Sequence, residues 1–178
     1  MASTDVDVIR LTSAHTDAVL ALYLAVAADG ASGLARQPHE IDRKYVRAFL
    51  EMVDANGLSL GLCEPGSPDR LLGELHATRM GPAQFNHVLT DLTIAIDPRQ
   101  QGRGLGSTLF RAYFDTVRRD LPEIRRIELL VRSGHAHARR LYERLGFVQE
   151  GCMIGRVQLA DGSVEDDIPM ALTLDRMR

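Results

Sequence analysis

A short glycine-rich segment is the part of the sequence best suited to bind a ligand. Residues 97–110 read Asp-Pro-Arg-Gln-Gln-Gly-Arg-Gly-Leu-Gly-Ser-Thr-Leu-Phe, so Gly102, Gly104 and Gly106 stand between a strand-like run, 89–96, and an amphipathic helical pattern. Glycine lets a backbone approach a ligand closely. The free N–H groups and the positive dipole end of a helix N-terminus attract phosphate. The segment therefore predicts a bound pyrophosphate, and with it a nucleotide-bearing cofactor.

Two other glycine motifs do not fit this segment. A P-loop requires Gly-Lys-Ser/Thr after four intervening residues, and no such lysine is present. A dinucleotide-binding fingerprint requires a third glycine three residues after the second, but Ser107 follows Gly104 at that distance and Leu109 follows Gly106. The spacing therefore argues against a dinucleotide-dependent oxidoreductase.

A second motif points to a protein family. Residues 101–106, Gln-Gly-Arg-Gly-Leu-Gly, resemble the Gln/Arg-x-x-Gly-x-Gly/Ala signature of the GCN5-related N-acetyltransferases, the GNAT superfamily. Residues 135–147, His-Ala-His-Ala-Arg-Arg-Leu-Tyr-Glu-Arg-Leu-Gly-Phe, resemble the family's Ala-x-x-Leu-Tyr-x-x-x-Gly-Phe element. The resemblance runs from about Gly73 to the C-terminus, whereas residues 1–57 match only in the order of their elements.

The resemblance implies acetyl-CoA as cofactor, used as a co-substrate, and no metal. Its pyrophosphate would lie on backbone N–H groups of residues 101–107, and its pantetheine between strands 88–96 and 124–131. Backbone N–H groups of residues 94–96 would polarise the thioester carbonyl. The family commonly has Asn where this chain has His135, which leaves that contact open. The implied cofactor-binding residues are Ile94, Ala95, Ile96, Gln101, Gly102, Arg103, Gly104, Leu105, Gly106, Ser107, His135, Ala138 and Arg139.

Two side chains are the expected catalytic groups. Tyr142 is the candidate general acid, because a phenol with an ordinary pKa of about 10 is protonated at neutral pH and can hydrogen-bond the departing sulfur. Asp91, where the family often has Glu, is the candidate general base acting through a water. Strand alternation places Asp91 on one face with Thr93 and Ala95. A packed core tyrosine and a solvated strand aspartate are the structural alternatives. Lesser candidates are Glu74, His76 and His87.

Hydrophobic periodicity predicts the elements that position these residues. Expected strands are 6–11, 58–63, 71–79, 88–96, 124–131, 151–159 and 164–174, and expected helices are 15–28, 40–54, 106–119 and 135–145. Ser13 is expected to cap the first helix, and Asp161-Gly162 to turn a hairpin. The predicted fold class is α/β of the mixed α+β kind. It has a central, mostly antiparallel sheet with one parallel, right-handed β-α-β crossover, flanked by helices.

Composition bounds the class of protein. The 178 residues are expected to form one domain, 1–178, and 45% hydrophobic with 25% charged residues is ordinary for a soluble globular chain. The sequence contains no run of about 18 apolar residues that could span a membrane. Residues 1–10 lack the apolar core of a signal peptide. A cytoplasmic location is therefore expected. Cys63 and Cys152 match no metal or redox spacing and are expected to be buried free thiols.

Charge divides the chain into an acidic and a basic part. Residues 1–98 carry 7 basic and 13 acidic side chains, whereas residues 99–178 carry 14 basic and 11 acidic ones. A basic region suits a polyanionic cofactor, and an acidic region suits a cationic substrate. The alternative is that most of these arginines coat helix surfaces. No nucleic-acid or membrane partner is expected.

The sequence thus predicts a cytoplasmic N-acetyltransferase that moves an acetyl group directly from acetyl-CoA to a small primary amine, such as an amino acid, an analogue or a polyamine. The chain's end, 151–170, resembles the hairpin of members that acylate amino acids and similar amines. Expected substrate contacts are the loop 30–38, the start of helix 40–54 and residues 165–167. Alternatives are a protein N-terminal acetyltransferase and a non-catalytic acetyl-CoA sensor or scaffold. A homodimer is a further expectation, since the family often dimerises.

Overall fold

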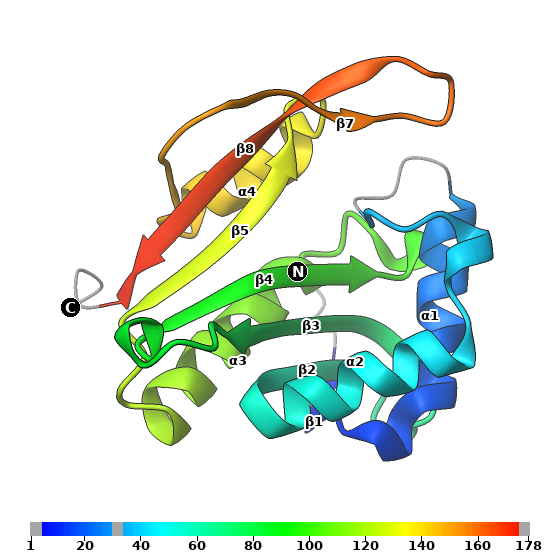
Figure 1. The fold of residues 1–178 in the computed structure, drawn as a ribbon. Coiled ribbons are helices and arrows are strands. Elements are labelled where there is room, and N and C mark those ends of the chain that lie inside the picture. Colours follow the sequence, from blue (N-terminus) through cyan, green and yellow to red (C-terminus); the bar gives the residue numbers. More distant parts are fainter. Residues whose placement is uncertain (1–4, 30–33, 175–178) are drawn as a thin grey trace. The chain divides into compact units, whose positions relative to one another are not determined.

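The structure, a computed structural model, describes residues 5–29 and 34–174. Its strands are β1 (Asp7–Arg10), β2 (Gly57–Cys63), β3 (Leu71–Arg79), β4 (Val88–Ile96), β5 (Arg126–Arg132), β6 (Val148–Gln149), β7 (Met153–Gln158) and β8 (Val164–Thr173). Its helices are α1 (Thr16–Ala28), α2 (Arg43–Asn56), α3 (Leu105–Asp120) and α4 (Ala136–Arg144) (Figure 1). The predicted order of elements is confirmed, and the two-residue strand β6 is an addition to it.

The strands follow the order β1-β2-β3-β4-β5-β8-β6 in one sheet, and β7 pairs with β8. The pair β4–β5 is parallel, with Val88 opposite Arg126 and Leu89 opposite Ile127. The pairs β1–β2, β2–β3, β5–β8, β6–β8 and β7–β8 are antiparallel. The predicted fold class, a mostly antiparallel mixed sheet with one parallel crossover, is confirmed. The right hand of that crossover stays a prediction.

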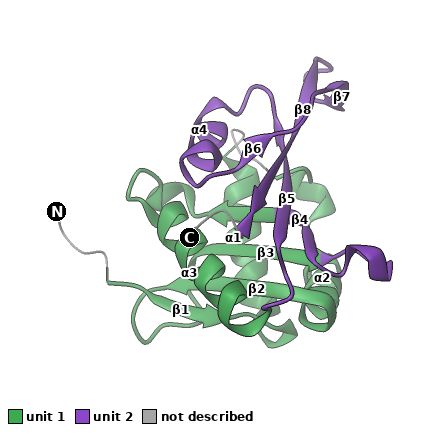
Figure 2. Cartoon of the chain, turned by 90° about the vertical axis from the view of Figure 1, so that its left-hand side faces the viewer, with its two compact units in different colours: residues 1–78, 93–121 green, residues 79–92, 122–178 purple. Residues whose placement is uncertain are grey.

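The chain divides into two compact units (Figure 2). Unit 1 consists of Met1–Thr78 and Thr93–Leu121, and unit 2 consists of Arg79–Leu92 and Pro122–Arg178. The strand β4 passes from unit 2 into unit 1 at Leu92. The glycine-rich segment therefore belongs to unit 1, and the motif that contains Tyr142 belongs to unit 2.

In unit 1, helices cover both faces of the strands (Figure 1). Phe49 of α2 stacks on the ring of His76 in β3, with 4.8 Å between ring centroids. Leu109 of α3 lies on the other face, because a Cβ added at Gly73 would meet its Cδ2 at 3.5 Å. Successive residues of a strand point to opposite faces. The even-numbered residues of β3 around His76 therefore face α1 and α2, and the odd-numbered ones face α3.

The junction between α2 and β2 has no connecting loop. The helix ends at Asn56 and the strand begins at Gly57. Gly57 has an extended backbone with φ of −160°, so its glycine is not required by a left-handed conformation. A Cβ there would lie 2.1 Å from the carbonyl oxygen of Ala77, so glycine lets β2 pair closely with β3. The helix thus ends two residues later than the predicted residue 54.

The first helix begins one residue later than predicted. A 3-10 turn, Ser13–His15, precedes α1. The hydroxyl of Thr12 caps that turn by accepting the N–H of Ala14 at 3.3 Å, so the expected role of Ser13 as N-cap is wrong. Thr12 can cap the turn because its extended backbone, which is usual for an N-cap residue, orients the hydroxyl toward the turn.

The second helix begins at Arg43 and not at residue 40. Asp42 fixes this start, because its Oδ1 accepts the N–H of Tyr45 at 2.7 Å. A 3-10 turn, Pro38–Glu40, occupies the preceding residues. The expected loop 30–38 is described only from residue 34, and residues 30–33 lie outside the described residues.

In unit 2, β8 pairs with three strands, and glycines lie at the end of α4 and in the predicted β7–β8 turn. Gly146 follows α4 with φ of 94°, and Gly162 lies in the β7–β8 turn with φ of 85°. This left-handed region favours glycine. Cys152 is exposed, and its thiol lies 3.4 Å from Oδ2 of Asp166. The expectation of two buried thiols therefore holds for Cys63 and is wrong for Cys152.

Candidate functional site

The glycine-rich segment of unit 1 turns sharply before α3. Gly102 and Gly104 have φ of 76° and 78°, in the left-handed region that glycine adopts without strain. Gly104 is the N-cap of α3, and no side chain caps this helix. A Cβ added at either glycine would meet nothing within 4 Å. The turn therefore needs these glycines, and a side chain added at either one would point into open space.

The first turn of α3 carries backbone donors that precede its first helical hydrogen bond. The first helical bond runs from the N–H of Thr108 to the carbonyl of Gly104 at 3.1 Å. Within the described part of the chain, the N–H groups of residues 102–107 have no hydrogen-bond acceptor. Unpaired donors at the positive end of a 16-residue helix form a place for an anion. The predicted cradle is thus open to a diphosphate, and its residues fit one.

Two arginines lie in the glycine-rich segment, and their side chains have different partners. Arg99 forms a bidentate ion pair with the buried carboxylate of Asp97, with distances of 3.1 and 2.7 Å. The hydrogen bond from Arg99 lowers the pKa of Asp97. Arg103 contacts the neutral side-chain oxygen of Gln100. The charge of Arg103 is therefore not neutralised by that contact and can act on a phosphate.

The end of β4 belongs to unit 1 and is held against β3. The N–H of Asp97 donates to the carbonyl of Leu72 at 2.9 Å. A Cβ at Gly73 would lie 2.6 Å from Cδ1 of Ile96 and 3.3 Å from the carbonyl oxygen of Ala95. Glycine at this position therefore lets β3 approach residues 94–96, whose backbone was predicted to contact a thioester.

Asp91 lies in the part of β4 that belongs to unit 2, and its backbone is unusual. Its φ is 53°, and it is the one non-glycine residue with positive φ in the described ranges. Aspartate tolerates this region better than most residues, yet it costs about 1 kcal/mol or more. Leu92 and Ala95 are both buried and Thr93 is half-buried, so strict alternation is not observed. The positive φ at Asp91 breaks the extended backbone on which that expectation depended.

Tyr142 lies on α4 in unit 2 and is buried. Its side chain is 7% exposed, and its ring is tilted by 59° against Phe147 at 5.9 Å between centroids. Burial raises the pKa of Tyr142 to about 12. The phenol is therefore protonated at neutral pH, which a general acid requires.

The remaining predicted residues of unit 2 lie around the start of α4. The ring Nε2 of His135 lies 3.0 Å from Nη2 of Arg132. Since a guanidinium only donates, Nε2 accepts, and the imidazole is neutral in this arrangement. Arg139 donates from Nη2 to the side chain of Gln149 at 3.2 Å, and its buried Nε has no partner within the described residues. Ala138 is half-buried on the same helix.

Glu74 and His76, the lesser catalytic candidates, belong to a buried polar cluster in unit 1 that also contains Tyr23 and Ser59. Glu74 is fully buried, and it accepts hydrogen bonds from the hydroxyls of Tyr23 at 2.7 Å and Ser59 at 2.8 Å. Nδ1 of His76 lies 3.0 and 3.2 Å from its two oxygens. Tyr23 and Ser59 were missed, because their approach depends on how α1 and β2 pack on β3. The sequence signal was two polar residues at i and i+2 in an apolar strand.

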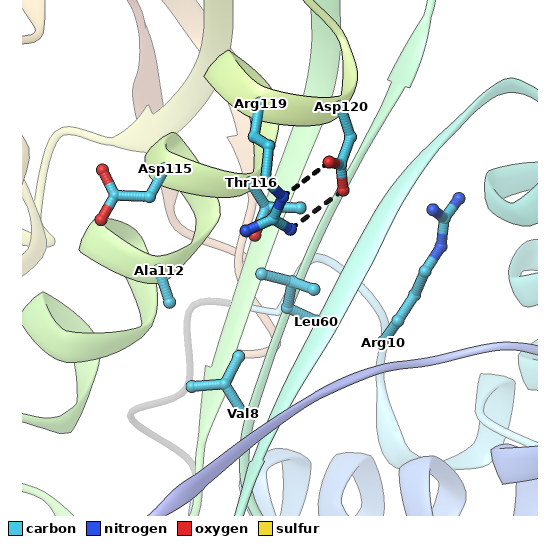
Figure 3. A pocket seen from close by; sticks show the side chains of 8 residues that line it. All are labelled: Val8, Arg10, Leu60, Ala112, Asp115, Thr116, Arg119 and Asp120. Atoms are coloured by element: carbon cyan, nitrogen blue, oxygen red, sulfur yellow. Dashed lines mark hydrogen bonds and ion pairs between the residues drawn. The ribbon is translucent and has the colours of Figure 1, made fainter.

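Unit 1 also contains a cavity of about 380 Å³ (Figure 3). Its lining residues are Val8, Arg10, Leu60, Ala112, Asp115, Thr116, Arg119 and Asp120. Arg119 and Asp120 form an ion pair there, with distances of 2.7 and 3.0 Å (Figure 3). None of the predicted site residues lines this cavity, so it is not the candidate site.

Among the residues that the structure describes, no group of three or more His, Cys, Asp or Glu side chains is placed to hold a metal ion. In the same residues, no helix combines the length and the apolar character needed to cross a membrane.

Comparison with known proteins finds a family model that matches the chain and solved structures with a similar fold. A family model described as "Acetyltransferase (GNAT) family" matches residues 35–147. The acetyltransferase of GNAT family from Streptococcus pneumoniae is similar over 95% of this chain and 99% of that chain, with 20% sequence identity and a TM-score of 0.83. No curated protein matches the chain significantly.

Two other solved structures have a similar fold. One is yncA from Salmonella typhimurium with its cofactor acetyl-CoA, with 20% identity, coverage of 96% and 94% of the two chains and a TM-score of 0.80. The other is a ribosomal-protein-alanine N-acetyltransferase from Brucella melitensis, with 20% identity, coverage of 94% and 99% and a TM-score of 0.79. At these identities the likeness concerns the fold alone.

Proposed function

Because the chain belongs to the acetyltransferase (GNAT) family, we propose that it transfers the acetyl group of acetyl-CoA directly to the primary amine of a small molecule. An amino acid, an amino-acid analogue or a polyamine is the proposed class of acceptor. The observation that carries the proposal is the row of unpaired backbone N–H groups at residues 102–107. The similar Salmonella structure, which contains acetyl-CoA, supports the same cofactor here.

The cofactor's proposed binding residues lie mainly in unit 1. When bound, acetyl-CoA supplies an acetyl group as a reactive thioester. The unpaired backbone N–H groups of residues 102–107 hold its pyrophosphate, and Arg103 adds positive charge beside them, whereas the N–H of Gln101 donates to the carbonyl of Pro98. Residues 94–96 offer backbone N–H groups to the thioester carbonyl. In unit 2, His135, Ala138 and Arg139 around the start of α4 complete the proposed set, as the family motif implies.

Two side chains move protons in the proposed reaction. Asp91 accepts, through a water, the proton that an ammonium group must lose to become a nucleophilic amine. Its exposure suits this role, because the proton can pass on to solvent. The phenol of Tyr142 donates its proton to the sulfur that leaves. The burial that raises the pKa of Tyr142 supports this role, since the proton is still present at neutral pH.

A small cationic acceptor is favoured by two features of the chain. The acidic side chains outnumber the basic ones by 13 to 7 in residues 1–98, which suits a positively charged amine. The C-terminal hairpin resembles that of members that acylate small amines. The name of the Brucella neighbour keeps a protein N-terminus as the second candidate acceptor. A cytoplasmic location and a homodimeric state complete the proposal, and light scattering tests the latter.

A screen of acceptors tests the proposed function. The purified protein is incubated with acetyl-CoA and panels of amino acids, polyamines, aminoglycosides and N-terminal peptides, and release of free CoA is measured. We expect release to depend on one of the small amines. Preference for a peptide would move the assignment to the second candidate. Tight binding of acetyl-CoA without release for any amine would favour a sensor or scaffold, and an acetylated Cys63 or Cys152 during turnover would exclude direct transfer.

A further inference from the structure

The proposed reaction leaves one proton unassigned. An ammonium group that becomes an amide loses two protons from its nitrogen, one before it attacks and one as the new bond forms. Asp91 accounts for the first of these. The sulfur gains its proton from Tyr142, so neither residue takes the second proton from nitrogen. A second base near the reacting nitrogen would take this proton directly.

The Glu74–His76 pair in unit 1 has the form of an oriented base. Both oxygens of Glu74 accept hydrogen bonds, from Tyr23, Ser59 and Nδ1 of His76. Burial and the charge of Glu74 raise the pKa of Tyr23 well above its ordinary value, so this phenol is a neutral donor. Within the described residues no arginine or lysine pairs with Glu74, and His76 is its only ion-pair partner. The carboxylate therefore holds the imidazole with Nδ1 protonated.

This orientation leaves the other ring nitrogen as the basic atom. When Nδ1 donates to a carboxylate, the lone pair of a neutral imidazole lies on Nε2. Nε2 of His76 has no hydrogen-bond partner within the described residues, and it is not sealed from solvent, because the side chain remains 10% exposed. Phe49 stacks on the ring with an interplanar angle of 22° and fixes its plane. The ring is therefore rigid, oriented and reachable by a polar group.

The position of His76 relates it to the part of β4 proposed to contact the thioester. Both lie in unit 1, and β3 and β4 are neighbours in the sheet. The bond from the Asp97 N–H to the Leu72 carbonyl is 2.9 Å long. β3 and β4 run in opposite directions (Figure 1), and a register continued from that bond would place His76 opposite Thr93, with about 5 Å between the two backbones. The imidazole thus stands one strand away from residues 94–96.

We propose that His76, oriented by Glu74, is the base that takes the second proton from the acceptor nitrogen; this inference rests on the proposed function. As the nitrogen–carbon bond forms, the nitrogen–hydrogen bond breaks and its proton passes to Nε2. The carbon–sulfur bond breaks with its electron pair on sulfur, which takes the proton of Tyr142. The imidazolium then releases its proton to solvent, and the phenolate of Tyr142 regains one. The net products are an amide, free CoA and one proton.

Three variants and one spectroscopic measurement test this role. In His76→Gln we expect kcat to fall by about 10²-fold or more, with the KM for acetyl-CoA unchanged and partial recovery on adding imidazole. In Glu74→Gln we expect a fall of about 10-fold or more, since the orientation is lost. His137→Gln, at an exposed position on α4, is the matched control and should stay within about twofold of the wild type. Imidazole ¹⁵N NMR of the protein without acetyl-CoA should show Nδ1 of His76 protonated, and a mixture of tautomers in Glu74→Gln.

The outcomes separate this inference from the proposed function. A wild-type protein that acetylates amines, with His76→Gln folded and of unchanged kcat, would overturn the role of His76 and leave the function intact. A wild-type protein that acetylates nothing would overturn both. If His76→Gln does not fold, the NMR spectrum decides. Protonation of Nε2 in the wild type would make the cluster purely structural, whereas protonation of Nδ1, with activity lost in folded Glu74→Gln, would support the base.

Discussion

Replacing Gly104 by alanine separates the cost of the turn from the binding of a diphosphate. Gly104 has φ of 78° and no atom within 4 Å of an added Cβ, so alanine meets backbone strain but no clash. A left-handed conformation costs a non-glycine residue roughly 1 to 2 kcal/mol. Alanine also reduces the entropy of the unfolded chain, which offsets part of that. We expect a net loss of about 1 kcal/mol, or about 2 to 4 °C in Tm for a domain of this size.

The same change should weaken the binding of CoA much more than it weakens the fold. A methyl group at the N-cap of α3, beside the unpaired N–H groups, would hinder close approach of the phosphates to them. Losing one hydrogen bond to a charged group costs about 1.5 to 3 kcal/mol, which raises Kd by roughly 10- to 150-fold. Isothermal titration calorimetry with CoA measures this. Titration with S-acetylpantetheine, which has no diphosphate, should give the same Kd for variant and wild type.

Gly66 provides the matched control. It has φ of 73°, and a Cβ there would also meet nothing within 4 Å, but it lies in the turn after β2. Gly66→Ala should therefore lose the same 1 kcal/mol or so of stability without any change in the Kd for CoA. If Gly104→Ala lowers Tm like its control and still binds CoA within about twofold of the wild type, the pyrophosphate does not lie on these amides, and the reasoning behind the proposed function fails.

Three further predictions concern the proposed catalytic residues. Asp91→Asn should lower kcat by about 10²-fold while Tm stays within about 2 °C, because asparagine also tolerates positive φ; equal kcat in steady-state assays would remove Asp91 from the mechanism. Tyr142→Phe should lower kcat by about 10²-fold with the KM for acetyl-CoA unchanged, and an unchanged kcat would leave this residue as a packing tyrosine. Since burial raises the pKa of Tyr142 to about 12, its share of stability is present below pH 10 and is lost as pH rises. Urea unfolding at pH 9 and pH 11 should therefore show a decrease roughly 1.4 kcal/mol larger for the wild type than for Tyr142→Phe, and equal decreases would contradict the shift.

Local patterns were enough to place most elements of this chain. The strands 71–79 and 88–96 have the predicted bounds, because turn residues flank both and their apolar content is high. The predicted starts of α1 and α2 were too early, because Thr12 caps a 3-10 turn that precedes α1 and Asp42 caps α2 itself. The short strand β6 was missed, since two residues carry no periodicity. Such a strand exists only because β8 is present to pair with it.

The candidate site was predictable where its chemistry depends on the backbone. The left-handed conformations of Gly102 and Gly104 follow from glycine itself, and the unpaired N–H groups follow from the start of a helix. The positive φ of Asp91 could not be predicted from the sequence, because glycine is the only residue type that indicates such positions reliably. The hydrogen bonds from Tyr23 and Ser59 to Glu74 depend on packing between distant segments, so local patterns contain no sign of them.

The direct passage from α2 into β2 restricts how this gene can change in length. No loop separates α2 from β2, so nothing there could accommodate an extra residue inserted at Gly57. The strand β2 would therefore shift by one residue against β3. A slip of one residue turns every side chain of a strand to the opposite face. Ser59 would then leave Glu74, and neighbouring leucines would take its place against a buried charge. The turn at Gly66 has open space around it and no such restriction. Epitope tags and natural length variation should therefore be tolerated there and be eliminated at residue 57.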